Sequence, residues 1–334
     1  MNIKKISILG GGSWGTVLSN LACNSSTEVL LWLRDREVAN EINSSFTNIK
    51  YLPNKKLNPN IKASVNIEDI ENSQVLIYCI PSEAFRDVVQ LSQPYVSKDA
   101  FLVTATKGVE RERFCLMSKV LEEYFTNPVG ILSGPNLAQE IVENHLTGTV
   151  IASKSKQLQD IIVSIFQSDS FRVYKNNDPN GVELGGTLKN IYALACGIAD
   201  GLDCGENTIG MIMTRGLGEM SRFAESLGAN PKTFLGLSGV GDLITTCASP
   251  LSRNHKIGKY LGQGLNLEDA QDKIGQTVEG IRTLNIVWEQ ANKLGVNMPI
   301  VNSLYKIIFK NAPLDGSIIN VLGEDIDNDV EFTK

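Results

Sequence analysis

Short apolar runs alternate with segments of helical periodicity along the first half of the chain. Seven such runs predict strands, at residues 6–9, 29–33, 75–80, 101–104, 129–132, 149–152 and 171–174. Helical patterns lie between them, as at residues 16–23, 82–91 and 114–124. Strands that alternate with helices favour a parallel, doubly wound α/β sheet.

The pattern changes after about Asn180. Leu184, Leu188, Ile191 and Ala195 follow one another at spacings of four, three and four, which makes one apolar helical stripe. Similar periodicity recurs at residues 208–227, 278–294 and 299–309. Because residues 175–181 are rich in Asn, Asp, Pro and Gly, they predict a boundary. We therefore expect an α/β domain over residues 1–180 and an all-helical domain over residues 181–334.

Length and composition agree with this division and narrow the function. A chain of 334 residues is long enough for two domains, and 42% hydrophobic with 20% charged residues is ordinary for a globular protein. The net charge of -6 argues against a general nucleic-acid-binding surface, although a local anion pocket is compatible with it.

The cysteine pattern and the N-terminus indicate a cytoplasmic protein without a metal. The six cysteines form no CxxC pair and only two histidines accompany them, so we expect reduced thiols and no zinc site. The basic start leads into an apolar run that is too short for a signal peptide and ends in glycines, so it predicts a strand. No run approaches the ~20 apolar residues of a membrane span.

A glycine motif follows the first predicted strand and opens the first predicted helix. The run Gly10-Gly11-Gly12-Ser13-Trp14-Gly15 fits G-x-G-x-x-G. In that context Gly10 permits the tight turn, Gly12 admits a pyrophosphate, and Gly15 allows close helix–strand packing. The helix N-terminus supplies amide donors for the anion. The first domain is thus predicted to be a dinucleotide-binding Rossmann domain.

Two residues at the end of the second predicted strand favour different cofactors. Asp35 stands twenty residues after Gly15, where an acid would bind the ribose of NAD. Arg34 beside it would instead suit the 2′-phosphate of NADP. The residues alone leave this choice open.

Hydride transfer to a carbonyl requires a proton donor, and a lysine is the candidate. His145 and His255 lie in polar, helix-start surroundings that are typical of solvated side chains. Lys189 lies in a helical segment one turn after Gly185, and two successive glycines cost a helix about 1–2 kcal/mol. We interpret the glycines as clearing one face of this helix for a ligand.

Polar side chains that follow two predicted strands complete the candidate chemistry. Lys107 follows the strand at 101–104, and Gly134 and Asn136 follow the next one, where ligands of open α/β sheets gather. Ser252 is typical of a helix N-cap. Arg253, just inside that helix start, predicts a local phosphate site.

These motifs together resemble those of bacterial NAD(P)-dependent glycerol-3-phosphate dehydrogenase over nearly the whole chain. The matching segments are the glycine motif and residues 80–86, 105–108, 133–135, 183–190, 239–243, 252–254 and 278–280. The resemblance implies a Rossmann domain followed by a helical substrate-binding and catalytic domain, and a homodimer. It also implies reversible reduction of dihydroxyacetone phosphate to sn-glycerol 3-phosphate for phospholipid synthesis.

The resemblance further implies roles for individual residues. Lys189 would be the proton donor and acceptor. Substrate would be bound by Lys107, Gly134, Asn136, Lys189, Asp242, Ser252, Arg253 and Asn254. NADPH, and also NADH, would be bound by Ser13, Trp14, Arg34, Lys107, Ala138, Arg253, Thr277 and Glu279. The family usually carries Thr or Ser at the position of Asn136.

Two other interpretations remain open on the residues. One is a related two-domain 3-hydroxyacid dehydrogenase, whose substrate ends in a carboxylate in place of a phosphate. The other is a non-catalytic dinucleotide sensor, against which the presence of Lys189 and Lys107 argues.

Overall fold

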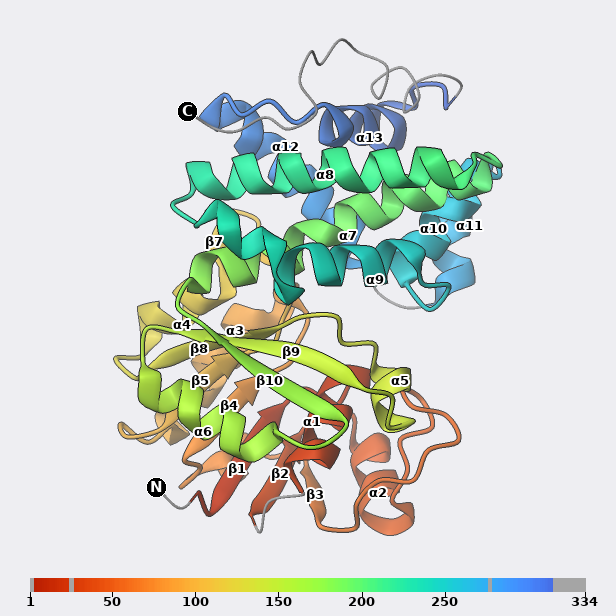
Figure 1. Cartoon of the computed structure of the whole chain (residues 1–334). Coiled ribbons are helices and arrows are strands. Elements are labelled where there is room, and N and C mark those ends of the chain that lie inside the picture. Colours follow the sequence, from red (N-terminus) through yellow and green to blue (C-terminus); the bar gives the residue numbers. More distant parts are fainter. Residues whose placement is uncertain (1–2, 24–26, 276–277, 315–334) are drawn as a thin grey trace. The chain divides into compact units, whose positions relative to one another are not determined.

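The structure is a computed structural model that describes residues 3–23, 27–275 and 278–314. The chain divides into two compact units, Met1–Pro179 and Asn180–Lys334, seen as the red-to-green and green-to-blue parts of Figure 1. No helix of the described part is long and apolar enough to cross a membrane.

An eight-stranded sheet forms the first unit, in the order β10-β9-β8-β5-β4-β1-β2-β3. The seven apolar runs are all confirmed as strands. The strands are β1 Lys5–Leu9, β2 Glu28–Trp32, β3 Ile61–Ser64, β4 Val75–Tyr78, β5 Phe101–Thr104, β8 Val129–Ser133, β9 Thr147–Ser153 and β10 Phe171–Asn176. The sequence pattern did not predict β3, because only two of its four residues are apolar.

The sheet departs from the predicted all-parallel order at one place. The strands β3, β2, β1, β4, β5 and β8 are all parallel, but β9 runs antiparallel to β8, and β10 is parallel to β9. The connection from β8 to β9 contains only the five-residue helix α5 (Ala138–Val142), which is too short to carry the chain back across the sheet. The chain therefore reverses beside β8.

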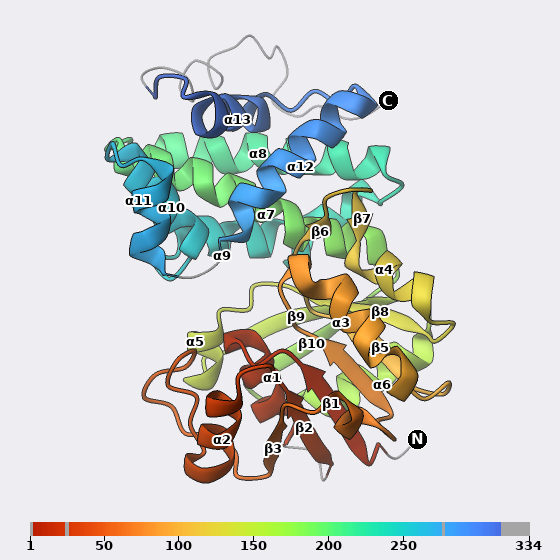
Figure 2. The same cartoon turned by 180° about the vertical axis from the view of Figure 1, so that it is seen from behind.

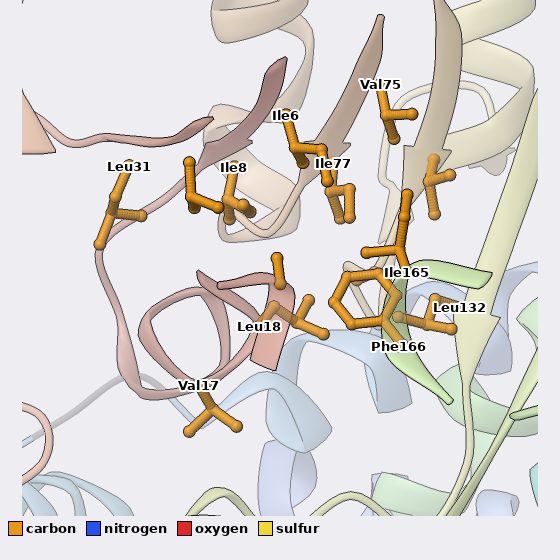
Figure 3. Close-up of a cluster of buried hydrophobic side chains, with 14 of the residues drawn as sticks. Ile6, Ile8, Val17, Leu18, Leu31, Val75, Ile77, Leu132, Ile165 and Phe166 are labelled. Carbon is orange, nitrogen blue, oxygen red and sulfur yellow. The ribbon is translucent and has the colours of Figure 1, made fainter. Parts of the chain in front are cut away.

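Helices cover both faces of this sheet because successive strand residues point to opposite faces. On one face, Ile6, Ile8, Val75 and Ile77 belong to a core formed with α1 (Ser13–Ala22), α2 (Arg36–Ser45) and α6 (Lys156–Phe166) (Figure 3). On the other face, Leu9, Leu76 and Tyr78 pack with α3 (Phe85–Ser92) and α4 (Met117–Tyr124). The predicted Rossmann arrangement is confirmed.

A small hairpin leaves the sheet after β5. It consists of β6 (Val109–Glu110) and β7 (Cys115–Leu116), which pair antiparallel. The helix predicted over residues 114–124 therefore begins only at Met117. A 3-10 turn, Ser82–Ala84, precedes α3. The hairpin and α3 are both visible in Figure 2.

The second unit is helical, with no strand among its described residues. Its helices are α7 Pro179–Gly201, α8 Glu206–Ser226, α9 Asp242–Ala248, α10 Arg253–Gly262, α11 Leu267–Ile274, α12 Glu279–Leu294 and α13 Pro299–Lys310. Every residue of α7 from Gly181 to Ala199 is buried, so this helix is the centre of the unit.

The central helix crosses α10 with the two backbones in direct contact. A Cβ atom on Gly197 would lie 2.1 Å from the carbonyl oxygen of His255, and one on Gly258 would lie 2.3 Å from that of Leu194. The next glycine on each helix is equally confined, namely Gly201 and Gly262. Only glycine permits this approach, which brings the start of α10 to the middle of α7.

A buried carboxylate ties α7, α8 and α13 together. Glu219 on α8 accepts hydrogen bonds from the Tyr192 hydroxyl at 3.0 Å and from the amides of Ile300 at 2.7 Å and Val301 at 3.4 Å. These amides lie in the first turn of α13, so Glu219 satisfies donors that the helix leaves unpaired. Burial raises the pKa of Glu219 to about 7.

Candidate active site

The glycine motif of the first unit forms a tight backbone cradle. Gly10 has a φ of 122°, and a Cβ there would lie 2.3 Å from the Cys79 carbonyl oxygen. A Cβ on Gly15 would lie 1.9 Å from the Gly10 oxygen, whereas one on Gly12 meets nothing within 4 Å. Among the described residues no side chain caps the start of α1, which follows Gly12. The cradle thus presents helix-end amides beside open space.

The segment after α2 is fastened to this cradle. Ser13 donates its hydroxyl to the Tyr51 carbonyl oxygen at 2.9 Å. Asn48 donates to the Gly11 oxygen at 3.0 Å and to Thr16 at 2.9 Å. The indole N–H of Trp14 is buried and has no hydrogen-bond partner among the described residues.

The structure changes the interpretation of the acid at the end of β2. One oxygen of Asp35 caps α2 by accepting from the amides of Glu37 and Val38, and the other pairs with Lys50 at 2.9 Å. The bond from Lys50, together with the cap, lowers the pKa of Asp35. Arg34 beside it is exposed. Sequence reasoning missed Lys50, because no local pattern links it to a residue fifteen positions earlier.

The polar residues after β5 and β8 meet as the strand order predicts. The Lys107 ammonium donates to the Gly134 carbonyl oxygen at 2.9 Å. Asn136 donates to the Gly148 oxygen at 3.3 Å and accepts from the Thr149 hydroxyl at 2.9 Å. The reversed strand β9 supplies these two partners. Ala138 is the first residue of the next helix, α5.

Lys189 lies inside the second unit with an acid and a hydroxyl. Only 6% of Lys189 and 1% of Asp242 is exposed. The Lys189 ammonium pairs with the Asp242 carboxylate and donates to the Thr246 hydroxyl at 2.7 Å. Thr246 was not predicted, although its place one helical turn after Asp242 on α9 was a usable signal.

The glycine that precedes Lys189 serves a purpose other than the predicted one. A Cβ on Gly185 would lie 2.3 Å from the Ser238 carbonyl oxygen, in the turn just before α9. The space at Gly185 is therefore filled by backbone, so the prediction that it clears room for a ligand is wrong there. This close approach brings Asp242, four residues after Ser238, to Lys189.

The start of α10 has the expected cap. Ser252 accepts a hydrogen bond from the His255 amide at 3.2 Å, which confirms it as the N-cap. Arg253 is the first residue of the helix and is exposed. Packing around its guanidinium lowers the pKa of Arg253 although solvent still reaches the side chain, and the charge of Glu279, at the start of α12, acts in the opposite direction.

Asn254 links three helices through its amide. It donates to the Asn190 side chain at 3.0 Å and accepts from the Gly280 amide at 2.9 Å. The residue after Lys189 is thus connected to the start of α12, where Glu279 lies. Thr277, the remaining predicted contact, lies outside the described residues.

The first unit carries a glycine cradle on a doubly wound sheet, and the second unit contains a buried Lys–Asp pair. Together these features define the class of two-domain, dinucleotide-dependent dehydrogenases. The family models for the N-terminus and the C-terminus of NAD-dependent glycerol-3-phosphate dehydrogenase match residues 5–159 and 178–318. The chain belongs to this family. The resemblance drawn from its motifs is confirmed, and the protein is an oxidoreductase of the nicotinamide-dependent kind.

Individual relatives agree over nearly their whole length. Glycerol-3-phosphate dehydrogenase [NAD(P)+] of Alcanivorax borkumensis is 46% identical over 97% of this chain and 95% of its own. The protein of the same name from Acinetobacter baylyi is 47% identical over 98% and 92%. The crystal structure of glycerol-3-phosphate dehydrogenase from Coxiella burnetii has a TM-score of 0.93 at 33% identity, covering 96% of this chain and 99% of that one.

Proposed function

We propose that this protein catalyses the reversible, NAD(P)H-dependent reduction of dihydroxyacetone phosphate to sn-glycerol 3-phosphate, which feeds glycerophospholipid synthesis. The observation that carries the chemistry is the buried Lys189 ammonium, oriented by Asp242 and Thr246. The substrate is inferred from the names of the relatives, which are glycerol-3-phosphate dehydrogenases. The family also decides against a 3-hydroxyacid dehydrogenase and against a non-catalytic sensor.

Lys189 is the proton donor and acceptor of this reaction. The Asp242 carboxylate pairs with the Lys189 nitrogen inside the helical unit. Two directed hydrogen bonds fix where that nitrogen lies. In the direction of reduction Lys189 gives a proton to the carbonyl oxygen of the substrate, and in the reverse direction it takes the proton from the hydroxyl.

The first unit fits a dinucleotide. The open space at Gly12 admits a pyrophosphate, the uncapped start of α1 offers it amide donors, and the buried Trp14 N–H lacks a partner in the described structure. When bound, a nicotinamide cofactor supplies or accepts the hydride. The residues that we propose hold it are Gly10, Gly12, Ser13, Trp14, Gly15, Arg34, Lys107, Ala138, Arg253, Thr277 and Glu279.

We assign both forms of the cofactor to the protein, with NADPH accepted through Arg34. Both carboxylate oxygens of Asp35 are already engaged, one by the amides at the start of α2 and the other by Lys50. Arg34 is exposed beside it and can pair with a 2′-phosphate through two N–H groups. NADH lacks this phosphate and needs no such partner.

The substrate offers a carbonyl, a hydroxyl and a phosphate dianion, and the dianion is the strongest point of attachment. Arg253 combines a guanidinium with the amides at the start of α10. The residues that we propose bind substrate are Lys107, Gly134, Asn136, Lys189, Asp242, Ser252, Arg253 and Asn254. Asn254 also forms hydrogen bonds with the Asn190 side chain and the Gly280 amide, so it positions the start of α12 against α7.

We further propose that the protein acts in the cytoplasm as a homodimer, as the family resemblance implies. Sedimentation equilibrium of the purified protein tests the dimer directly. A mass that corresponds to one chain at micromolar concentration would overturn it.

The decisive experiment is an NADPH oxidation assay with dihydroxyacetone phosphate. We expect turnover with dihydroxyacetone phosphate and, in the reverse direction, with sn-glycerol 3-phosphate. A 3-oxoacid of similar size serves as the carboxylate control and should be a poor substrate. If the 3-oxoacid is reduced faster than the phosphate ester, the proposed substrate is wrong.

A further inference from the structure

The loop that carries Lys107 is fastened on both sides to one other segment of the first unit. Before Lys107, the Thr106 hydroxyl donates to the Ile80 carbonyl oxygen at 2.7 Å. After it, Glu110 at the end of β6 pairs with Arg86 at the start of α3. Residues 80–86 and 105–110 are thus joined at two points, and Lys107 lies between these points along the chain. The hairpin of β6 and β7 lies beside the start of α3 in Figure 2.

Arg86 grips Glu110 with the geometry of a two-point clamp. Its Nε donates to one carboxylate oxygen at 2.5 Å and its Nη2 donates to the other at 2.9 Å. Its Nη1 donates to Glu123 at 2.5 Å and to the Tyr124 hydroxyl at 3.2 Å, both on α4. Two parallel bonds between a guanidinium and a carboxylate fix direction as well as distance.

This cluster differs from an ordinary surface ion pair. The side chains of Arg86 and Glu110 are 21% and 19% exposed, and Arg86 engages three partners at once. Isolated exposed pairs contribute little to stability, whereas networks with bidentate geometry contribute more. The side chain of Arg113, which also approaches Glu123 at 3.8 Å, is 67% exposed and provides a contrasting pair on the same surface.

We infer that Arg86 is a positioning residue for Lys107: by holding Glu110, it fixes the loop that directs the Lys107 ammonium to the end of β8. The Lys107 contact that would be lost is its 2.9 Å bond to the Gly134 carbonyl oxygen. The kinetic part of this inference rests on the proposed role of Lys107 in binding. The effect of Arg86 on the loop geometry does not depend on that role.

The test compares Arg86→Gln, Arg86→Lys and Glu110→Gln with the control Arg113→Gln. We expect Arg86→Gln to lower kcat/KM for dihydroxyacetone phosphate by roughly tenfold, because a charge-assisted clamp is lost. Arg86→Lys should restore little, since an ammonium cannot make two parallel bonds. Glu110→Gln should match Arg86→Gln, the double variant should be no worse than either single one, and Arg113→Gln should resemble the wild type.

A Lys107→Ala background separates positioning from general damage. There, adding Arg86→Gln should change neither kcat/KM nor the NADPH dissociation constant further. If Arg86→Gln costs the same factor with and without Lys107, Arg86 acts independently and the inference is wrong. A loss of thermal stability with unchanged kinetics would also overturn it.

Hydrogen exchange keeps this test distinct from the proposed function. Amides of residues 105–110 should exchange faster in Arg86→Gln than in the wild type and in Arg113→Gln. If the wild type fails to reduce dihydroxyacetone phosphate but this local change occurs, only the proposed substrate fails. Unchanged exchange in an otherwise folded Arg86→Gln variant would refute the clamp.

Discussion

The buried ammonium of Lys189 gives the most direct prediction for a single residue. Lys189→Met should lower kcat by about 10²–10⁴-fold, because general acid–base catalysis contributes that much, while NADPH binding is retained. The change strands the buried charge of Asp242, so the variant Lys189→Met with Asp242→Asn is made in parallel. Steady-state kinetics measures both. Turnover near the wild-type rate in either variant would remove Lys189 from its proposed role.

Arg34 should decide how well the 2′-phosphate is bound. Arg34→Ala is expected to raise KM for NADPH strongly and KM for NADH little, because only NADPH carries the phosphate. The exposed neighbour Arg36, varied to Ala, is the control. Equal weakening of both cofactors in Arg34→Ala would show that the arginine does not recognise the phosphate.

Arg253 should recognise the substrate phosphate. Arg253→Ala is expected to reduce kcat/KM for dihydroxyacetone phosphate by roughly 10–150-fold, the equivalent of one charge-assisted bond. Activity on phosphate-free dihydroxyacetone, already poor without that binding energy, should fall much less. Lys256→Ala, an exposed cation on the same helix, is the comparison. The same loss on both substrates would leave Arg253 as a cofactor contact.

Between elements, the crossing of α7 and α10 depends on the absence of side chains. Gly258→Ala should lower the free energy of unfolding by at least about 2 kcal/mol, because the new methyl would overlap the Leu194 carbonyl oxygen. Gly210→Ala, in the interior of α8 with nothing within 4 Å, should instead gain up to about 1 kcal/mol. Denaturant unfolding measures both. A neutral Gly258→Ala would mean that the helices separate without cost.

The Glu219 carboxylate makes the packing of α7, α8 and α13 depend on pH. Its pKa is about 7 in the folded protein, against an ordinary value of 4.5, so the folded state holds the extra proton between these values. Stability therefore falls as the pH rises through this window, by about 3 kcal/mol in total, since a charge must then be buried.

Glu219→Gln isolates this effect, because its amide does not titrate. The wild type should lose stability relative to Glu219→Gln as the pH rises from about 4.5 to about 7, as measured by denaturant unfolding at several pH values. Other titrating groups are common to both proteins and cancel. Parallel curves for the two proteins would contradict the raised pKa.

For the molecule as a whole, the sequence was enough to predict seven of the eight strands of the main sheet and the change to a helical second unit. These follow from periodicity, which reports how residues are buried. It does not report which partner they meet. The antiparallel placement of β9 depends on connection length, and the edge strand β3 has only two apolar residues among four, so the apolar pattern could not reveal either.

In the candidate site, too, the sequence reveals the residues that belong to motifs but not the partners that they meet. The motif residues Lys107, Gly134 and Asn136 could be grouped from the sequence, because the ends of parallel strands share one edge. The partners Lys50 and Thr246 come from segments with no motif of their own. Gly185 was misinterpreted because a glycine signals close approach without saying whether a ligand or backbone approaches.

The central position of α7 has a consequence for how the chain is made. Residues 1–179 leave the ribosome first and contain all the strands of the sheet, so this unit can fold while synthesis continues. The helix α7 emerges next, but its close partner α10 begins about fifty residues later. At about 5–20 residues per second this interval lasts roughly three to ten seconds. During it, α8 and α9 can already pack on α7, but the backbone surface at Gly197 and Gly201 that α10 covers in the finished protein lacks its partner. A chaperone that shields this surface would therefore act in these seconds.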